Sequence, residues 1–372
     1  MDESILNLPD NEKIEYFMQR TIKHPYFVQA CNELLYLIKG TSGKTLTIVI
    51  GPSGVGKSHV IDEISATVLK EESQLMLDHP DYIPLISWKV EAASTKTFSW
   101  KSTFYEGFRH LNQSEDMSKK KIGFKAGSMG STSDLRRAFE NSIEHRGLKW
   151  LIFDEAQHFN KALSGPSAQD NMDVLKSLAD QTKCRVILVG TYELRDMLFY
   201  SAQLSRRSKI IHFPRYNLMK LERELAHFQK AVRTFEPLIP LEEKTDLYSN
   251  WAFLYERTIG CIGTLKDWLQ DALLLALHEN SRKLHLTHLE RTAQGLRECE
   301  RMLEEAEAGE KLLAESSSKR TAFRKKLGLD IETNTEQQEI STNVQASKTI
   351  LKKHFKRKPS RDATGLKKTR RN

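Results

Sequence analysis

The stretch GPSGVGKS at residues 51–58 is the part of the sequence whose residue types and spacing indicate chemistry most directly. It fits the pattern G-x-x-x-x-G-K-[ST] of a phosphate-binding loop, in which glycines let backbone N–H groups close on phosphate oxygens. In this pattern Lys57 reaches the β- and γ-phosphates of ATP, and Ser58 binds Mg²⁺. A chance match in a glycine-rich turn is the alternative, which an apolar run before the loop and helical periodicity after it argue against. The predicted nucleotide contacts in this stretch are Gly51, Pro52, Ser53, Gly54, Val55, Gly56, Lys57, Ser58 and His59.

Two carboxylates follow an apolar run later in the chain, in KWLIFDE at residues 149–155. At the carboxyl end of a strand, Asp154 is suited to nucleotide binding and to the shell of Mg²⁺. Glu155, one residue further on, is suited to orienting or deprotonating the attacking water. A solvated strand end is the alternative, and the phosphate-binding loop elsewhere in the chain weighs against it.

Polar and basic residues near two further apolar runs complete the catalytic candidates. Thr191 follows the run CRVILVG at 184–190, where its hydroxyl can lie between the carboxylates and the γ-phosphate. Capping of the strand end is the alternative role for Thr191. Arg206 and Arg207 precede the last run, and an arginine at a subunit edge can stabilise charge on a neighbour's γ-phosphate. That role requires a homo-oligomer, whereas a solvated basic loop does not, and the sequence does not choose between the two arginines.

Five short apolar runs are expected to form the strands that position these residues. Helical segments separate most of the runs, for example 57–69, 135–145 and 171–181. Apolar strands that alternate with helices predict an α/β fold with a five-stranded parallel sheet covered on both faces. The predicted strands are 45–50, 83–90, 150–153, 185–189 and 209–213.

The sequence pattern predicts four segments. Residues 1–44 are expected to be helical, and residues 45–214 to form the nucleotide-binding core, with a Gly-, Ser- and Lys-rich insertion at 112–133. A helical unit is predicted at 215–315, and its acidic end from 296 to 316 is expected to be a solvated helix. Residues 316–372 lack apolar periodicity, so we expect a disordered basic tail. The helices predicted in the third segment are 218–235, 242–257, 263–279 and 287–307.

The charge of the chain is concentrated at one end. The 372 residues carry 57 Lys and Arg against 49 Asp and Glu, for a net charge of +8. Residues 341–372 have eleven Lys and Arg against one Asp, a surplus of ten, so the other 340 residues sum to −2. This excludes a globular domain that is basic throughout. The tail could bind DNA as an arm, dock on a partner or keep an oligomer soluble.

Features that mark membrane or secreted proteins are missing from the sequence. The four cysteines, at 31, 184, 261 and 299, lie far apart and form neither a metal-ligand pair nor a disulfide framework. No run approaches the roughly 18 apolar residues of a membrane span. The beginning MDES is acidic and lacks a signal-peptide core. We therefore expect a cytoplasmic protein with no membrane partner.

Together these motifs resemble those of AAA+ ATPases and, within that class, the TniB/TnsC group of transposition regulators of bacterial transposons. The resemblance implies an AAA+ P-loop NTPase core followed by a helical lid. It also implies a bacterial ATPase that assembles as a ring or filament on double-stranded target DNA. Such a protein takes a signal from a target-selecting partner and recruits and activates the transposase, with ATP favouring assembly and hydrolysis favouring disassembly. The stretches that carry the resemblance are GPSGVGKS, WLIFDEAQHF, VILVGTYELRDML, QLSRRSKIIHF, GCIGTLK at 260–266 and RTIKHPYF at 20–27.

The lid stretch departs from the family pattern at one position. Relatives often carry a basic second sensor just after the glycine pair, where this chain has Thr264. Lys266 is the nearest cation, and the resemblance implies that it substitutes as a nucleotide contact. A surface lysine is the alternative.

Two segments supply candidate DNA contacts, one at residues 92–101 and one at residues 119–133. Family members place basic and hydroxyl residues in both segments. Phosphate contacts of this kind would be independent of sequence and sensitive to salt. Ordinary solvated loops are the alternative for both segments. The candidate residues are Lys96, Thr97 and Lys101 in the first segment, and Lys119, Lys120, Lys121 and Thr132 in the second.

The motifs allow two other functional interpretations. One is an AAA+ ATPase of another kind, such as a helicase loader or a secretion-associated ATPase. The other is a nucleotide-binding scaffold with negligible hydrolysis, which the presence of Glu155 argues against.

Overall fold

The computed structural model describes residues 3–40, 45–92, 98–112, 130–160, 168–195, 208–220 and 222–329. The chain divides into two compact units, Met1–Leu313 and Ala314–Asn372. The first unit contains the sheet and the helices around it. No described helix is both long enough and apolar enough to cross a membrane.

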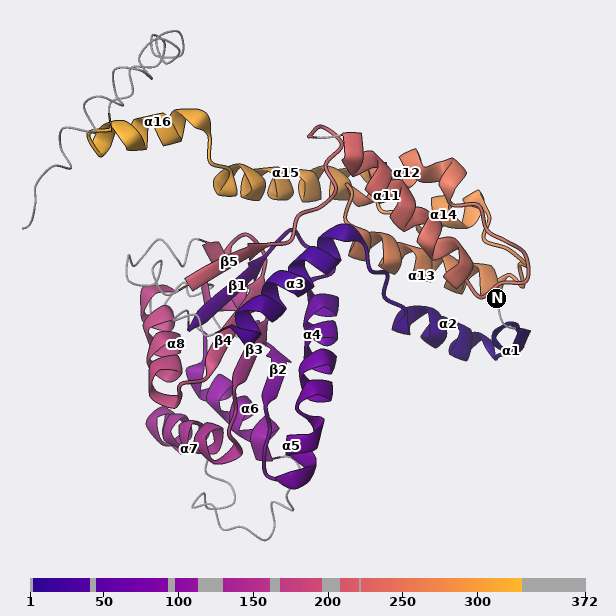
Figure 1. The fold of residues 1–372 in the computed structure, drawn as a ribbon. Coiled ribbons are helices and arrows are strands. Elements are labelled where there is room, and N and C mark those ends of the chain that lie inside the picture. Colours follow the sequence, from indigo (N-terminus) through magenta and orange to yellow (C-terminus); the bar gives the residue numbers. More distant parts are fainter. Residues whose placement is uncertain are drawn as a thin grey trace, which may run out of the picture. The chain divides into compact units, whose positions relative to one another are not determined.

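Five parallel strands form one sheet in the order β2-β3-β4-β1-β5 (Figure 1). In its register, Ile50 at the end of β1 pairs with Gly190 of β4 and His212 of β5. The carboxyl ends of the strands therefore lie along one edge. The predicted α/β fold with a five-stranded parallel sheet is confirmed. The strands are β1 Leu46–Ile50, β2 Leu85–Lys89, β3 Trp150–Asp154, β4 Arg185–Gly190 and β5 Ser208–His212.

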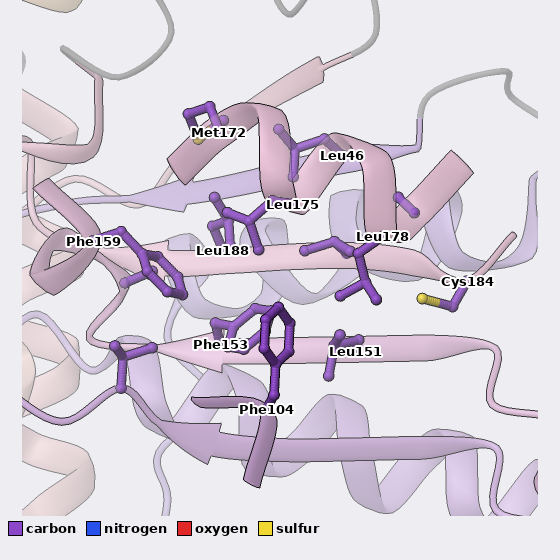
Figure 2. Packing of buried hydrophobic residues seen from close by; sticks show 14 of the residues in the cluster. Leu46, Phe104, Leu151, Phe153, Phe159, Met172, Leu175, Leu178, Cys184 and Leu188 are labelled. Carbon is purple, nitrogen blue, oxygen red and sulfur yellow. The ribbon is translucent and has the colours of Figure 1, made fainter. Parts of the chain in front are cut away.

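Helices cover both faces of the sheet (Figure 1). Alternate strand residues point to opposite faces, so Val49 and Ile152 pack with α3 and α4, while Ile48 and Leu151 pack with α6, α7 and α8. Figure 2 shows the second cluster, in which side chains of α6 and α8 lie over β3 and β4. The helices on the two faces are α3 Pro25–Lys39, α4 Lys57–Glu71, α6 Trp100–Asn112, α7 Thr132–Arg146 and α8 Ala168–Thr182.

The helices after β5 have a hydrophobic core of their own, which also takes Phe17 from α2 near the beginning of the chain. Trp268 and Leu265 of α13 lie in it, and the indole N–H of Trp268 donates to the carbonyl of Leu289 at 3.1 Å. These helices form the predicted lid. The remaining helices are α1 Glu3–Leu6, α2 Asp10–Gln19, α5 Ser73–Asp78, α11 Glu222–Phe235, α12 Trp251–Thr258, α13 Ile262–His278, α14 Leu286–Thr292, α15 Leu296–Leu313 and α16 Ser317–Lys326.

The helix predicted over 242–257 begins only at Trp251. The carboxylate of Glu236 accepts hydrogen bonds from the backbone N–H groups of Leu247 and Tyr248, at 2.9 and 2.8 Å. Asp246 in turn accepts from the N–H of Ser249 at 3.0 Å. These side chains hold backbone donors that a helix would use, which explains the late start.

The helix predicted over 287–307 is two helices, α14 and α15, separated at Ala293, Gln294 and Gly295. Ala293 is extended, and the carbonyl of Gln294 accepts from Arg257 at 3.0 Å. Further along, Ser317–Lys326 form α16, with Ser316 accepting from the N–H of Lys319, where the sequence predicted no regular structure. The local cap accounts for this helix.

Candidate nucleotide-binding site

The predicted phosphate-binding loop connects β1 to α4. Gly54 and Gly56 have φ of +71° and +105°, a conformation that strains residues with a Cβ. Gly51 allows close approach of the chain after β5, because a Cβ there would lie 2.1 Å from the carbonyl oxygen of Phe213. The helix α4 begins at Lys57, so the N–H groups of its first turn are available to phosphate oxygens.

Lys57 is buried within the loop it follows. Its ammonium donates to the carbonyl oxygens of Gly51 and Pro52 at 3.1 and 2.8 Å. Burial lowers the pKa of this ammonium to about 8, although the charges of Glu155 and Asp154 act to raise it. A buried cation held by neutral carbonyls is a favourable place for an anion.

Ser58 and Asp154 meet although they lie 96 residues apart. The hydroxyl of Ser58 donates to Oδ2 of Asp154 at 2.8 Å, and Oδ1 accepts from the N–H of Glu155 at 2.9 Å. Asp154 is buried. A buried carboxylate beside a hydroxyl fits Mg²⁺, which prefers oxygen ligands, so the predicted metal ligands lie together as one pair.

Glu155 has a left-handed backbone, with φ of +54° directly after β3. This is unusual for a residue with a side chain and is a form of strain found at functional sites. Its carboxylate accepts a hydrogen bond from the amide of Gln157 at 2.5 Å. Glu155 therefore lies at the sheet edge that carries Asp154, as the sequence predicted.

Thr191 also lies at this edge, directly after β4. Its backbone N–H donates to the side chain of Gln157 at 3.2 Å. Its hydroxyl oxygen is buried and has no hydrogen-bond partner among the described residues. A buried polar atom of this kind commonly binds a ligand or water. A contact between the Thr191 hydroxyl and a γ-phosphate, as predicted, would satisfy it.

A cavity of about 290 Å³ opens beside Thr191 and the beginning of the loop. It is lined by Pro52, Ser53 and Thr191 and by residues of α15. Gly309 of α15 lies so close to the ring of Tyr192 that a Cβ at position 309 would come within 2.1 Å of the ring carbons. The helix expected to be solvated is therefore buried along one face, and that face lines the cavity.

An ionic cluster holds α15 to the segment that follows β5. The carboxylate of Glu310 contacts Arg215 at 3.0 Å and Lys220 at 2.9 Å. Burial alone would raise the pKa of Glu310, but the hydrogen bond from Lys220 and the charge of Arg215 hold it below its usual value. The stability that the ionised Glu310 contributes is fully present at pH values above the ordinary pKa range of a carboxyl group. It is lost as the pH falls through the lowered pKa of Glu310.

Replacing Glu310 by Ala is expected to lower the free energy of unfolding by about 3–5 kcal/mol, because it leaves a buried charge unpaired. The side chain of Arg215 is only 3% exposed. Lys220→Ala is the matched control and should cost less than about 1 kcal/mol, since exposed ion pairs contribute little, and the Lys220 side chain is 53% exposed. Urea unfolding of the full chain measures both, and equal losses would contradict the assignment.

A second, smaller pocket lies at the other side of the loop. It is bounded by the segment before α3, by the loop, and by the start of α13. Lys266 lines this pocket, and its ammonium donates to the carbonyl of Met18 at 2.6 Å and contacts Nε2 of His59 at 3.3 Å. Burial and the nearby Lys266 charge lower the pKa of His59. Lys266 is thus buried rather than a surface lysine, and it lies beside His59.

The lid touches the phosphate-binding loop directly. The N–H of Thr264 donates to the carbonyl of Gly54 at 2.7 Å. Gly263 is required there, since a Cβ would lie 2.5 Å from that same oxygen. The start of α13 is therefore in contact with the loop, and a movement of one would displace the other.

The predicted DNA contacts and the arginine pair are only partly described. Lys101 lies in the first turn of α6 and Thr132 begins α7. Trp100, beside Lys101, donates to Asn171 of α8 at 2.7 Å, and Arg136, one turn after Thr132, donates to Ser177 of α8 at 2.8 Å. The DNA contacts of Lys101 and Thr132 stay a prediction. The other predicted residues, Lys96, Thr97, Lys119, Lys120, Lys121, Arg206 and Arg207, lie outside the described residues, as does the chain from 330 onward.

No sequence pattern predicted the roles of Gln157, Tyr192 and the buried face of α15. Gln157 stands within the quoted stretch WLIFDEAQHF, so its proximity to Glu155 was a usable signal. The pocket beside Lys266 includes Thr21 and His24, which belong to the quoted stretch RTIKHPYF. No local signal marks Gly309, because its partner Tyr192 is distant in the chain.

Residues 39–198 match the family described as the AAA domain, and this segment contains the loop, both carboxylates and Thr191. No curated protein matches the sequence.

Solved structures resemble the chain in fold at low sequence identity. The ORC1 protein of Aeropyrum pernix in complex with DNA is 14% identical, with a TM-score of 0.51 over 75% of this chain and 68% of that one. The ORC2 protein of Aeropyrum pernix is 15% identical, with a TM-score of 0.46 over 74% and 70%. The Walker-type ATPase paby2304 of Pyrococcus abyssi is 16% identical, with a TM-score of 0.45 over 74% and 75%. The ORC1 likeness in fold, together with the match to the AAA domain, confirms the AAA+ P-loop NTPase fold.

Proposed function

We propose that the chain is an ATP-hydrolysing switch that assembles on DNA and regulates transposition in the bacterial cytoplasm. The observation that carries the ATPase part is the 2.8 Å contact of Ser58 with Asp154, which brings the loop and the DE strand together. Glu155 lies at the same edge, as does the Thr191 hydroxyl, which has no partner in the described part of the chain. This is the arrangement that phosphoryl transfer from a nucleoside triphosphate to water requires.

Each residue of the site has a distinct part in this function. Ser58 and Asp154 would hold Mg²⁺, which neutralises phosphate charge when bound. Lys57 would exchange the carbonyls of Gly51 and Pro52 for the β- and γ-phosphates. Glu155 would orient and deprotonate water, and the Thr191 hydroxyl would contact the γ-phosphate. His59 and Lys266 would contact the nucleoside end of ATP beside the small pocket that they line.

The finer assignment, to the TniB/TnsC group of transposition regulators, is supported by the sequence stretches that resemble that group. In this function ATP favours an oligomer on duplex DNA, and hydrolysis releases it. An arginine from a neighbouring subunit, Arg206 or Arg207, would complete the site. A target selector would direct the oligomer, and the oligomer would recruit and activate the transposase.

The function is tested with the full chain, duplex DNA and Mg²⁺. We expect co-sedimentation with DNA in the presence of a slowly hydrolysed ATP analogue and loss of association with ADP. Electron microscopy of the same sample should show a ring or filament. We also expect a transposase gene beside this one, and its product should be stimulated by the protein and ATP. Hydrolysis without DNA association, or without any effect on transposition, would favour a different AAA+ ATPase, such as a helicase loader.

A matched pair of variants tests whether DNA contacts are local. Lys101→Ala should weaken DNA binding and reduce the slope of log K against log salt by about one per subunit, as expected for a lost phosphate contact. Lys70→Ala, at the exposed end of α4, should leave both unchanged. Equal effects of the two variants would argue against a specific contact by Lys101.

A further inference from the structure

Gln157 joins the two polar groups that the proposed hydrolysis depends on. Its Nε2 donates to Oε2 of Glu155 at 2.5 Å, and its Oε1 accepts from the backbone N–H of Thr191 at 3.2 Å. The residue is only 6% exposed. One short side chain thus spans from the end of β3 to the end of β4.

The surrounding backbone leaves one place for this amide. A Cβ at Gly190 would lie 2.2 Å from Oε1 of Gln157 and 2.8 Å from Leu194, so only glycine at 190 allows the amide to reach the N–H of Thr191. That N–H can only donate, so it fixes which end of the amide is oxygen. The NH₂ end is then directed to Glu155, and the amide cannot rotate without losing both contacts.

From this geometry we infer that Gln157 is a positioning residue, which fixes the carboxylate of Glu155 relative to Thr191 for activation of water. The inference rests on the proposed ATP hydrolysis. The amide occupies Oε2 of Glu155 and leaves Oε1 for water. Because an amide has no titratable proton, it donates to Glu155 at any ordinary pH without competing for the proton that Glu155 receives.

This arrangement also connects the γ-phosphate to the base. Thr191 would contact the γ-phosphate through its hydroxyl, and its backbone N–H donates to Gln157. A merely structural Gln157 would instead satisfy buried groups and have no separate effect on turnover.

Two substitutions distinguish these roles. Gln157→Ala should lower kcat for ATP at least about tenfold, within the range that a positioned general base supplies, with KM and the affinity for ADP changed less than about twofold. Gln157→Glu places a carboxyl where the amide was, and that carboxyl can donate to Glu155 only while protonated. Its kcat relative to wild type should therefore fall as pH rises from about 6 to 9, because two ionised carboxylates would repel each other.

Gln29→Glu is the matched control, because Gln29 donates to Glu33 at 2.8 Å on the exposed surface of α3. It should leave kcat and the pH profile unchanged. The thermal stability and ADP affinity of each variant show whether it is folded. An unchanged or raised kcat in Gln157→Ala, or a pH profile of Gln157→Glu that parallels wild type, would overturn the inference. Loss of ADP binding along with kcat would also overturn it, by showing a structural role. No hydrolysis by the wild-type protein with DNA would refute the proposed function itself.

Discussion

Lys57→Met is expected to abolish nucleotide binding while leaving the nucleotide-free protein at least as stable as wild type. Lys57 is buried, and its ammonium donates to the carbonyls of Gly51 and Pro52. Methionine has a similar length and no charge to desolvate. The variant loses the cation that would face the β- and γ-phosphates, and it also loses the cost of burying that cation.

The pH dependence of stability provides an independent measurement of the same residue. Burial lowers the pKa of Lys57 from 10.5 to about 8 in the folded chain. Between these values the unfolded chain holds a proton that the folded chain has lost, so the free energy of unfolding rises with pH. The full span corresponds to about 3 kcal/mol, at 1.4 kcal/mol per pKa unit. Lys57→Met should lack this rise.

The affinity of wild type for ATP should change in the opposite direction. Phosphate binding requires the charged ammonium, so above about pH 8 the protein must take up a proton when it binds. Affinity should therefore decline as pH rises, and calorimetry in buffers of different ionisation enthalpy should detect the proton uptake.

Lys70→Met on the exposed end of α4 is the control for removal of a lysine from the same helix. Equilibrium binding of a fluorescent ADP derivative and urea unfolding at pH 7.5 and 9.5 measure the two effects. Retained nucleotide binding would show that Lys57 does not face the phosphates. A large loss of stability in the nucleotide-free variant would show that its contacts to the two carbonyls outweigh the cost of burial.

The pairing of Ser58 with Asp154 could be predicted from the sequence because both follow apolar β-branched or aromatic runs. Such runs form strands of one parallel sheet, and the carboxyl ends of those strands share an edge. The residues after β1, β3 and β4 therefore converge without any knowledge of side-chain contacts. The same argument places Glu155 and Thr191, and it needs only the type and direction of the strands.

Contacts made between layers could not be predicted in this way. The burial of Gly309 against Tyr192 depends on the path of the chain after α14, which turns at Ala293 and Gly295. The acidic composition of α15 indicates solvent on one face and does not reveal the other. Lys266 shows a similar limit, since its contact with His59 depends on how the lid lies on the loop. These features follow from tertiary packing between distant segments, which local periodicity does not encode.

Glu155→Gln is expected to lower kcat for ATP hydrolysis by about 10²–10⁴-fold, the range attributed to a positioned general base, while ATP affinity stays within about threefold. The introduced amide keeps the shape of the side chain, and its oxygen can still accept the hydrogen bond from Gln157. The loop, Ser58 and Asp154 are unchanged, so the nucleotide contacts remain. What the variant loses is the basic carboxylate that would take a proton from water.

If ATP favours assembly and hydrolysis favours release, this variant should remain on DNA as an ATP-bound oligomer. Its dissociation after dilution should be slower than that of wild type, and a slowly hydrolysed analogue should slow wild type to the same rate. Glu71→Gln, which alters an exposed ion pair with Lys39, is the control and should behave as wild type. Asp154→Asn should differ from both, because it disturbs the partner of Ser58 and would weaken Mg²⁺-dependent binding itself. Dissociation of Glu155→Gln as fast as wild type, with ATP still bound, would separate hydrolysis from release and contradict the switch.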